Sequence, residues 1–241
     1  MKAVVLAGGQ GTRLRPLTFS IPKPLLPIGE KPILEIILKN FKTFGITDVI
    51  ISLGYQGELV KAFCGDGSKF GVSVQYIEEE KPLGTAGPLS LMRDFFSEGE
   101  KIVLMNGDIF TELDFSKMID YHNNGKYCMT IGYRTYEHKL PFGVLELEDT
   151  KLRCIVEKPS TNFNVSAGIY VFDASVIDFV PDNAFFTMPD LANKLLEEKY
   201  DIGTYHIEEY WLGIENIGHF NEAIKQLDKV ESLAKERSVR D

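Results

Sequence analysis

The 241-residue sequence is poor in cysteine, in positive charge and in long hydrophobic runs. Its cysteines, Cys64, Cys128 and Cys154, are an odd number without a C-x-x-C pair, which suggests neither a disulfide framework nor a zinc site. A net charge of −9 argues against nucleic acid or an anionic membrane as a partner. No stretch approaches the roughly 20 apolar residues of a membrane span, and the apolar run at the N-terminus is too short for a signal peptide. We therefore expect a soluble, cytoplasmic protein.

The chain also lacks linkers, repeats and low-complexity segments. With 44% hydrophobic residues it can bury one substantial core. The sequence pattern changes near residue 127, from alternating strands and helices to successive strands. We predict a single domain over residues 1–241 that consists of two halves, about 1–126 and about 127–241.

In the first half, strand-like runs that are apolar on both faces alternate with helical periods. This pattern predicts an α/β fold with a mainly parallel sheet covered by helices on both sides. The second half is expected to add antiparallel strands and a floor for a second ligand site. We predict strands at 3–7, 48–53, 72–77, 101–105, 127–134, 143–147, 152–157 and 165–172, and helices at 33–44, 59–63, 85–96, 189–198 and 219–235.

The most informative segment follows the first strand, where Gly8, Gly9 and Gly11 precede Arg13. Glycines let bare backbone N–H groups approach a phosphate chain. Residues 1–31 carry a local charge of +4, whereas the rest of the chain sums to −13. A basic island on an acidic protein points to a small anionic ligand, and a nucleoside triphosphate suits this arrangement.

Two common phosphate-binding motifs do not fit this segment. A Walker A loop requires Lys-Ser or Lys-Thr after the last glycine, and a dinucleotide fingerprint requires a glycine at the position of Leu14. The missing glycine argues against a dinucleotide-dependent oxidoreductase. The segment instead resembles the signature of the sugar-1-phosphate nucleotidyltransferases, which is Gly-Gly-x-Gly-Thr-Arg-Leu-x-Pro-Leu-Thr followed by Lys-Pro-x-x-Pro. Residues 8–18 and 23–27 match it without a gap.

The resemblance implies a Rossmann-like three-layer α/β/α fold and an enzyme that transfers a nucleoside monophosphate from a nucleoside triphosphate (NTP) to a sugar 1-phosphate, releasing pyrophosphate. It implies that Arg13 holds the departing phosphates, that Lys23 lies beside the α-phosphate, and that Asp108 binds Mg²⁺. The product would be a precursor for glycan or polysaccharide synthesis. The nucleotide-binding positions carried over by the resemblance are Leu6, Ala7, Gly8, Gly9, Gly11, Thr12, Arg13, Pro82, Gly84, Thr85 and Asn106.

A second glycine-containing segment, Pro82 to Leu89, bears on the choice of nucleobase. Its Gly-Thr-Ala-Gly-Pro-Leu form resembles the guanylyltransferases of the mannose-1-phosphate type, so GTP is the favoured substrate. A helix that begins at Thr85 or Ala86 would point its first N–H groups at the ligand.

The acceptor side of the family pattern is matched in the second half of the chain. The resemblance implies that a glycine approaches the sugar, that a glutamate accepts hydrogen bonds from sugar hydroxyls, and that a lysine meets the sugar phosphate. The corresponding positions are Gly143, Glu157, Lys158, Ser166 and Gly168, with Ser166 standing where relatives usually have Asn. The sequence leaves open whether the acceptor is mannose-, heptose-, glucosamine- or glucose-1-phosphate.

One departure concerns the metal. Relatives commonly read Trp-x-Asp-Ile-Gly, where the Asp is a second metal ligand, but Gly213 occupies that position here. Glu215 lies two residues further on, and an extended segment would point it to the same side. Glu215 or water could complete the metal shell, or Asp108 alone could anchor the ion. The alternative is a protein of the same fold, weakened in catalysis, that binds nucleotides or nucleotide sugars for regulation. The oligomeric state stays open, a homo-oligomer included.

Overall fold

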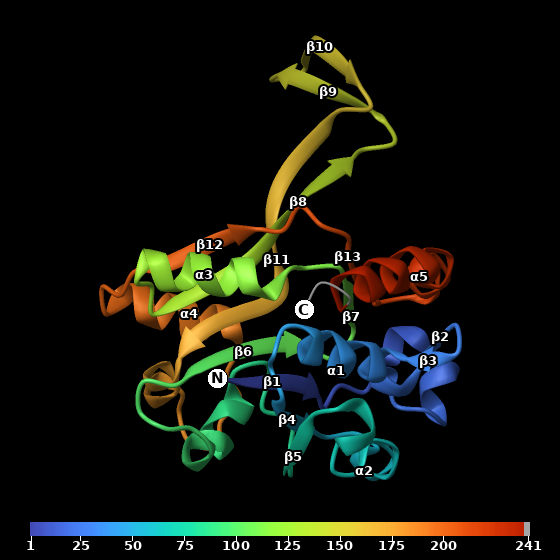
Figure 1. Cartoon of the computed structure of the whole chain (residues 1–241). Helices are drawn as coiled ribbons and strands as arrows, with labels where there is room; N and C mark the ends of the chain where they lie inside the picture. The colour runs from blue at the N-terminus through green and yellow to red at the C-terminus, as the bar shows by residue number, and fades with distance from the viewer. Residues whose placement is uncertain (239–241) are drawn as a thin grey trace.

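The computed structural model describes the backbone of residues 1–238 and the side chains of residues 1–227. A central seven-stranded sheet runs in the order β12-β8-β11-β6-β1-β4-β5 (Figure 1). Strands β6, β1, β4 and β5 are mutually parallel, β11 is antiparallel to both of its neighbours, and β12 is parallel to β8. The sheet strands are β1 (Lys2–Ala7), β4 (Asp48–Leu53), β5 (Ser73–Glu78), β6 (Lys101–Asn106), β8 (Met129–Lys139), β11 (Ser160–Asp173) and β12 (Ile202–His206). The predicted α/β fold with added antiparallel strands is confirmed.

Helices cover both faces of this sheet. Alternate residues of β1 point to opposite faces: Val5 packs with α1, α3 and α5 in one apolar cluster, and Val4 packs with η5, η6 and α4 in another. The helices are α1 (Ile33–Thr43), α2 (Gly57–Cys64), α3 (Phe115–Gly125), α4 (Met188–Glu197) and α5 (Ile217–Ser238), with 3₁₀ helices η1 (Thr12–Leu14), η2 (Leu17–Phe19), η3 (Lys23–Leu25), η4 (Ser68–Phe70), η5 (Gly87–Phe95) and η6 (Ala174–Phe179). The three-layer arrangement is therefore confirmed.

Helix α1 shows how the apolar pattern forms these layers. Leu34, Leu38 and Phe41 recur at helical spacing and are fully buried against the sheet. The helix ends at Thr43, just before Gly45, whose φ of 73° belongs to the left-handed region that glycine adopts at little cost. The predicted start and stop are matched closely.

Helix α3 and strand β12 were not predicted. Several short strands were also missed, because two or three residues carry too little periodicity to identify a strand. The short strands form two small ladders beside the main sheet. The pairs are β2 (Pro27–Ile28) with β3 (Lys31–Pro32), and β7 (Ile109–Thr111) with β13 (Trp211–Gly213). The β7–β13 ladder matters for the site, because it places residues 213–215 beside the end of β6.

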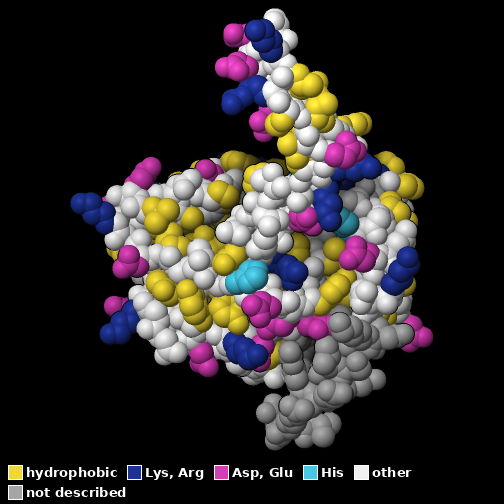
Figure 2. Space-filling view, turned by 90° about the horizontal axis from the view of Figure 1, so that it is seen from above, with side chains coloured by type: hydrophobic (Ala, Val, Ile, Leu, Met, Phe, Trp, Pro, Cys, Tyr) yellow, Lys and Arg dark blue, Asp and Glu magenta, His cyan; other side chains and the backbone are white. Residues whose placement is uncertain are grey.

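The outer parts of β8 and β11 leave the body and continue into a hairpin formed by β9 (Gly143–Glu148) and β10 (Lys151–Glu157). We call residues 135–164 the arm. Figure 1 shows it rising away from the sheet, with the hairpin at its tip. Every arm residue is exposed except Val144 and Pro159, which are half-buried. Figure 2 shows hydrophobic side chains on the surface of the projecting arm. The hairpin thus stands apart from the body, and the expected floor is not formed by it.

Within residues 1–238, no helix has both the length and the apolar character that crossing a membrane requires.

Candidate active site

The glycine-rich segment turns sharply after β1. Gly11 has a φ of 59°, and its carbonyl accepts a hydrogen bond from Thr18 Oγ1 at 2.8 Å. Thr18 is buried, and a Cβ at Gly11 would lie 2.9 Å from Thr18 Cγ2. A side chain is therefore excluded at Gly11 both by backbone strain and by lack of space. The buried threonine holds the loop in the shape that its glycines permit.

Close backbone packing also fixes the start of the loop. A Cβ at Gly54, which follows β4, would lie 2.6 Å from the carbonyl oxygen of Gly8. Gly9, by contrast, has open space around its Cα, with nothing within 4 Å of a Cβ built there. The loop is thus packed against the protein at Gly8 and open toward the cavity at Gly9.

A charged pair lies at the edge where β1 and β6 end. Asp108 follows β6, and the N–H of Gly107 donates to the carbonyl of Leu6 at 2.9 Å, so the two strand ends stay together. The Lys23 ammonium, presented by η3, forms an ion pair with the Asp108 carboxylate. Their side chains are only 14% and 28% exposed, respectively. The predicted catalytic residues Lys23 and Asp108 are therefore in direct contact.

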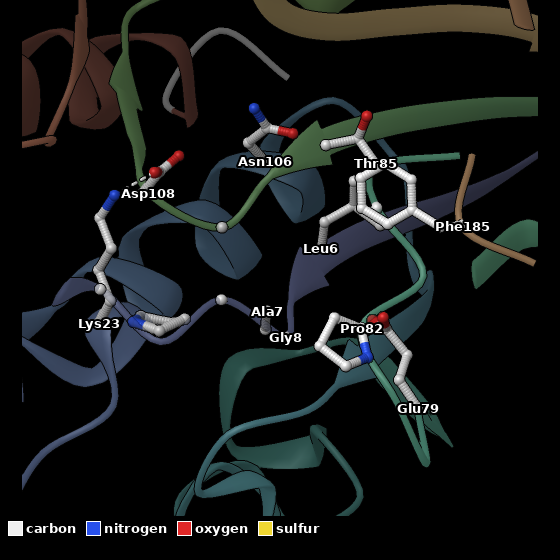
Figure 3. A pocket seen from close by; sticks show the side chains of 15 residues that line it. Leu6, Ala7, Gly8, Lys23, Glu79, Pro82, Thr85, Asn106, Asp108 and Phe185 are labelled. Atoms are coloured by element: carbon white, nitrogen blue, oxygen red, sulfur yellow. Dashed lines mark hydrogen bonds and ion pairs between the residues drawn. The ribbon is translucent and has the colours of Figure 1, made fainter. Parts of the chain in front are cut away.

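A cavity of about 340 Å³ opens between the carboxyl ends of these strands (Figure 3). Nine of the eleven predicted nucleotide-binding residues line it, and the other two, Thr12 and Arg13, line the neighbouring cavity described below. The lining consists of Leu6, Ala7, Gly8, Gly9, Gly11, Lys23, Pro24, Glu79, Pro82, Gly84, Thr85, Asn106, Gly107, Asp108 and Phe185. In open α/β sheets, ligands bind at the carboxyl ends of the parallel strands, which is where this cavity lies.

The second cavity, of about 270 Å³, adjoins the first and shares Gly11, Lys23 and Asp108 with it. Arg13 and Glu215 line its other side, and their side chains form an ion pair at 2.6 Å. Glu215 reaches this place because β13 pairs with β7 and the N–H of Ile214 donates to the Asp108 carbonyl at 2.9 Å. Glu215 and Asp108 thus line one cavity.

The segment around Gly84 differs from the expectation in one respect. The helix after it begins at Gly87 and is a 3₁₀ helix. The N–H groups of Ala86 and Gly87 both donate to the carbonyl of Phe186 at 2.9 Å, so they are not directed at a ligand as predicted. A carbonyl from a distant loop has taken these donors, a partner that the local sequence does not reveal. Thr85 Oγ1 is similarly occupied, since it accepts the N–H of Met188 at 2.8 Å.

Four lining residues were not among the predicted site residues: Pro24, Glu79, Gly107 and Phe185. Pro24 and Gly107 are sequence neighbours of the predicted Lys23 and Asp108. Glu79 comes directly after β5, and a carboxylate at the end of a parallel strand is a signal that could have been used. Phe185 comes from the loop before α4 and reaches the cavity only through the fold (Figure 3). No local pattern marks Phe185.

The predicted acceptor residues fall into two groups. Gly168 lies beside the cavity, because a Cβ on it would be 2.5 Å from Asn106 Nδ2, and its φ is 67°. Ser166 is two residues away, and its hydroxyl shares a hydrogen bond of 2.9 Å with the Tyr170 hydroxyl. Burial raises the pKa of Tyr170 above its ordinary value, so this phenol stays protonated at neutral pH. Trp211 helps to fix the strand by donating its Nε1–H to the carbonyl of Ala167 at 2.9 Å.

The other group lies on the arm. Gly143 and Glu157 face each other across the hairpin, where a Cβ on Gly143 would be 3.0 Å from the Glu157 carboxylate. Glu157 and Lys158 are 71% and 67% exposed, and neither residue lines the two cavities. The structure brings these three residues together at the base of the β9–β10 hairpin but not to the nucleotide cavity, and their role stays a prediction.

Comparison with known proteins decides the family. Residues 2–230 match the family model described as nucleotidyl transferase. The chain belongs to this family. Mannose-1-phosphate guanylyltransferase of Mycobacterium tuberculosis (strain ATCC 25618 / H37Rv) is 36% identical over 183 residues, which cover 74% of this chain and 50% of that protein. UTP–glucose-1-phosphate uridylyltransferase of Synechocystis sp. (strain PCC 6803) is 30% identical over 244 residues, 93% of this chain and 63% of that protein. The chain therefore spans about half the length of the guanylyltransferases it matches.

Solved structures place this nucleotidyl transferase family member in the same Rossmann-like fold. A Bacillus anthracis protein assigned as a glucose-1-phosphate thymidylyltransferase, crystallised with sucrose, is 28% identical, with a TM-score of 0.76. The alignment covers 93% of this chain and 94% of that one.

The donor set in the second cavity fits Mg²⁺. Asp108 and Glu215 offer carboxylate oxygens, which are the ligands that this ion prefers. Among the residues that the structure describes, no group of three or more histidine, cysteine, aspartate or glutamate side chains could hold a metal. Mg²⁺ is usually held by one or two carboxylates, supplemented by substrate phosphates and water.

Proposed function

We propose that the protein transfers a nucleoside monophosphate from an NTP, preferentially GTP, to a sugar 1-phosphate and releases pyrophosphate. The observation that carries this proposal is the Lys23–Asp108 pair at the junction of the two cavities, beside the glycine loop. A site that only binds nucleotides does not need a half-buried cation and a carboxylate together at the position where the phosphates would enter.

In this reaction, a phosphate oxygen of the sugar 1-phosphate attacks the α-phosphorus of the NTP in line, and pyrophosphate leaves. Positioning and charge neutralisation do most of the work in such a transfer. The open face at Gly9 lets backbone N–H groups approach the phosphates, and Lys23 would stabilise charge that develops at the α-phosphate. Arg13, at 74% exposure, can exchange Glu215 for the departing phosphates.

Asp108 and Glu215 would hold Mg²⁺, which when bound neutralises negative charge on phosphate oxygens. In the structure each carboxylate pairs with a cation, Asp108 with Lys23 and Glu215 with Arg13. Lys23 and Arg13 therefore help to hold the two carboxylates in position. Glu215 would supply the oxygen that Gly213 lacks.

A second candidate function is a regulatory protein that binds nucleotides or nucleotide sugars and is weak in catalysis. Gly213 favours it, because relatives commonly have the second metal-binding aspartate at that position. Lys23 and Asp108 favour the enzyme.

The test is pyrophosphate release from each common NTP, with Mg²⁺, across a panel of sugar 1-phosphates. Release with GTP and one hexose or heptose phosphate is the expected result, for an enzyme of glycan precursor synthesis. If the folded protein binds an NTP but releases no pyrophosphate with any pair of NTP and sugar 1-phosphate, the regulatory function replaces the enzymatic one as the proposal.

A further inference from the structure

The hairpin at the tip of the arm has one apolar side. Two leucines of β9 alternate with two glutamates, which is the period of a strand that buries one face. In antiparallel strands, residues that pair directly point to the same side of the sheet. Leu145 pairs with Ile155 of β10, and Leu147 pairs with Leu152. These four side chains therefore share one side of the hairpin, which we call the apolar face.

The opposite side of the hairpin is mainly polar. By the same pairing it carries Val144, Glu146, Glu148, Lys151, Cys154 and Val156. Figure 2 shows hydrophobic side chains along one side of the arm and charged side chains along the other. Antiparallel sheets with this division of side chains pack the apolar face on a second layer and leave the polar face in water.

No second layer is present on the apolar face. Its four side chains are 54–58% exposed, and among the described residues the two apolar clusters of the body include none from the arm. A two-stranded hairpin needs packing against another element for stability in water. A contiguous exposed apolar patch rimmed by polar residues is typical of an interaction surface. The apolar face therefore calls for a covering surface.

The chain's own body does not supply that surface. Residues 135–139 of β8 pair with residues 160–164 of β11 as the two strands leave the body. The ladder continues to the hairpin, because the Leu140 N–H donates to the Pro159 carbonyl at 3.0 Å and the Lys158 N–H donates to the Phe142 carbonyl at 3.2 Å. Folding the apolar face back onto the body would break these hydrogen bonds. The covering surface must come from another molecule.

The distribution of charge favours a second copy of this chain. The arm carries five acidic and four basic residues, a net charge of −1, so the rest of the chain carries −8 of the total of −9. Two bodies of charge −8 repel each other, whereas two nearly neutral arms do not. Because the arm rises away from the body, two copies can meet through their hairpins while the bodies stay apart (Figure 1). A strongly basic partner would be attracted to the body instead.

We propose that the apolar face of the hairpin packs against the same face of a second copy, related by a two-fold axis. In such a contact the same patch is used on both copies, and two antiparallel sheets pack face to face about 10 Å apart. The leucines and the isoleucine of the two hairpins then form a small core outside both bodies. This inference concerns assembly and does not depend on the proposed reaction.

The contact would also stabilise part of the predicted acceptor site. Gly143 and Glu157 are paired at the base of the hairpin, and a Cβ on Gly143 would lie 3.3 Å from Ile155 Cγ2. These residues therefore border the apolar face. A hairpin that is packed in a dimer holds them more firmly than a hairpin that stands alone in water.

The test compares two neighbouring residues on opposite sides of the hairpin. Ile155→Glu places a carboxylate in the proposed contact, and Val156→Glu, the matched control, places the same group one residue further on, on the polar face, where Val156 is 41% exposed. Both changes add the same charge to the same strand. We expect Ile155→Glu to raise the dissociation constant of the dimer at least about 100-fold, because the two-fold axis repeats the unpaired charge and each copy weakens the contact about tenfold. Val156→Glu should change it by less than about threefold.

Sedimentation velocity of the 241-residue chain over a range of concentrations measures the dissociation constant, and circular dichroism checks that each variant is folded. Leu147→Glu, on the other strand of the apolar face, is a second variant that should behave like Ile155→Glu. The contact stabilises the dimer and not the separate chain, so urea denaturation of dilute, monomeric protein does not report it.

A wild type and a Val156→Glu variant that dimerise, with Ile155→Glu and Leu147→Glu monomeric at the same concentration, support the proposal. A wild type that is monomeric at every concentration overturns it. A dimer that both face variants retain uses another surface, which also overturns it. Equal weakening by Ile155→Glu and Val156→Glu would show association through the hairpin edges, and the apolar face would then not be the contact.

Discussion

The nucleotide cavity and the arm are built on different physical principles. Around the cavity, Lys23 and Asp108 contact each other, and the glycine loop is held by the buried Thr18. On the arm, Glu157 and Lys158 are mostly exposed and lie on a hairpin whose residues are not buried. Core packing therefore preorganises the first set of residues, whereas the second set depends on a two-stranded ladder, which is marginally stable by itself in water. Motif residues of one family can thus be positioned with very different precision.

The apolar side chains of the two regions show the same contrast. Ile50 and Ile51 are buried in the central sheet, whereas Phe142, Leu147 and Ile155 are more than half exposed on the arm. Hydrophobic residues on the arm therefore contribute little to the free energy of unfolding of the described chain.

The largest expected effect tests this contrast in stability. Ile51→Ala leaves a cavity in the core and should lower the free energy of unfolding by about 2–5 kcal/mol. Ile155→Ala, the same substitution on the arm, should change it by less than about 0.5 kcal/mol. Urea denaturation of both variants measures the difference, and equal losses would show that the arm is packed in solution.

The next effect concerns turnover. Lys23→Ala removes the half-buried cation and should reduce kcat by at least about 10²–10³-fold while the fold stays intact. Pyrophosphate release measures the rate, and circular dichroism measures the fold. Lys117→Ala, at an exposed position of α3, is the control and should leave both unchanged. Near-normal turnover of the Lys23 variant would contradict the assignment of this residue.

A smaller effect is expected from the arm. If Glu157 accepts sugar hydroxyls as the family pattern implies, Glu157→Ala should raise KM for the sugar 1-phosphate about tenfold, as expected for a lost hydrogen bond to a charged group. Because Glu157 lines neither cavity, the dissociation constant for the NTP should not change. Steady-state kinetics with each substrate varied separately would measure this, and an unchanged KM for the sugar would remove Glu157 from the acceptor site.

The smallest effect is a pH dependence of stability. Burial lowers the pKa of His122 below its ordinary value, with a further lowering from Lys101 that Asp173 opposes. The unfolded chain then binds a proton before the folded chain does, so stability is lost as the pH falls below about 6.5. Between pH 7.5 and 5.5 the wild-type protein should lose free energy of unfolding as the unfolded chain takes up a proton at His122. We expect His122→Asn to reduce this loss by up to about 1.4 kcal/mol. Urea denaturation at both pH values measures the loss, and His138→Asn on the arm is the control. If the His122 variant loses as much stability as the wild type, titration of His122 is not the cause.

The sequence analysis missed helix α3 and strand β12. It did determine the other strands of the central sheet, the helices α1, α2, α4 and α5, and the glycine turn after β1. These features follow from local rules, since periodicity identifies buried faces and glycine is required where a turn or a close backbone approach excludes Cβ. The same rules placed Asp108 at the carboxyl end of a strand, whereas the predicted roles of residues 8–18 and Lys23 came from the resemblance to the sugar-1-phosphate nucleotidyltransferases.

Only the tertiary structure decided which distant groups complete the site. The Phe186 carbonyl takes the N–H groups of Ala86 and Gly87, Phe185 enters the cavity from a remote loop, and β7–β13 pairing brings Glu215 beside Asp108. Glu157, the last residue of β10 on the arm, likewise lines neither cavity. Each of these outcomes depends on contacts between residues far apart in the chain, and such contacts leave no periodic signal in the sequence.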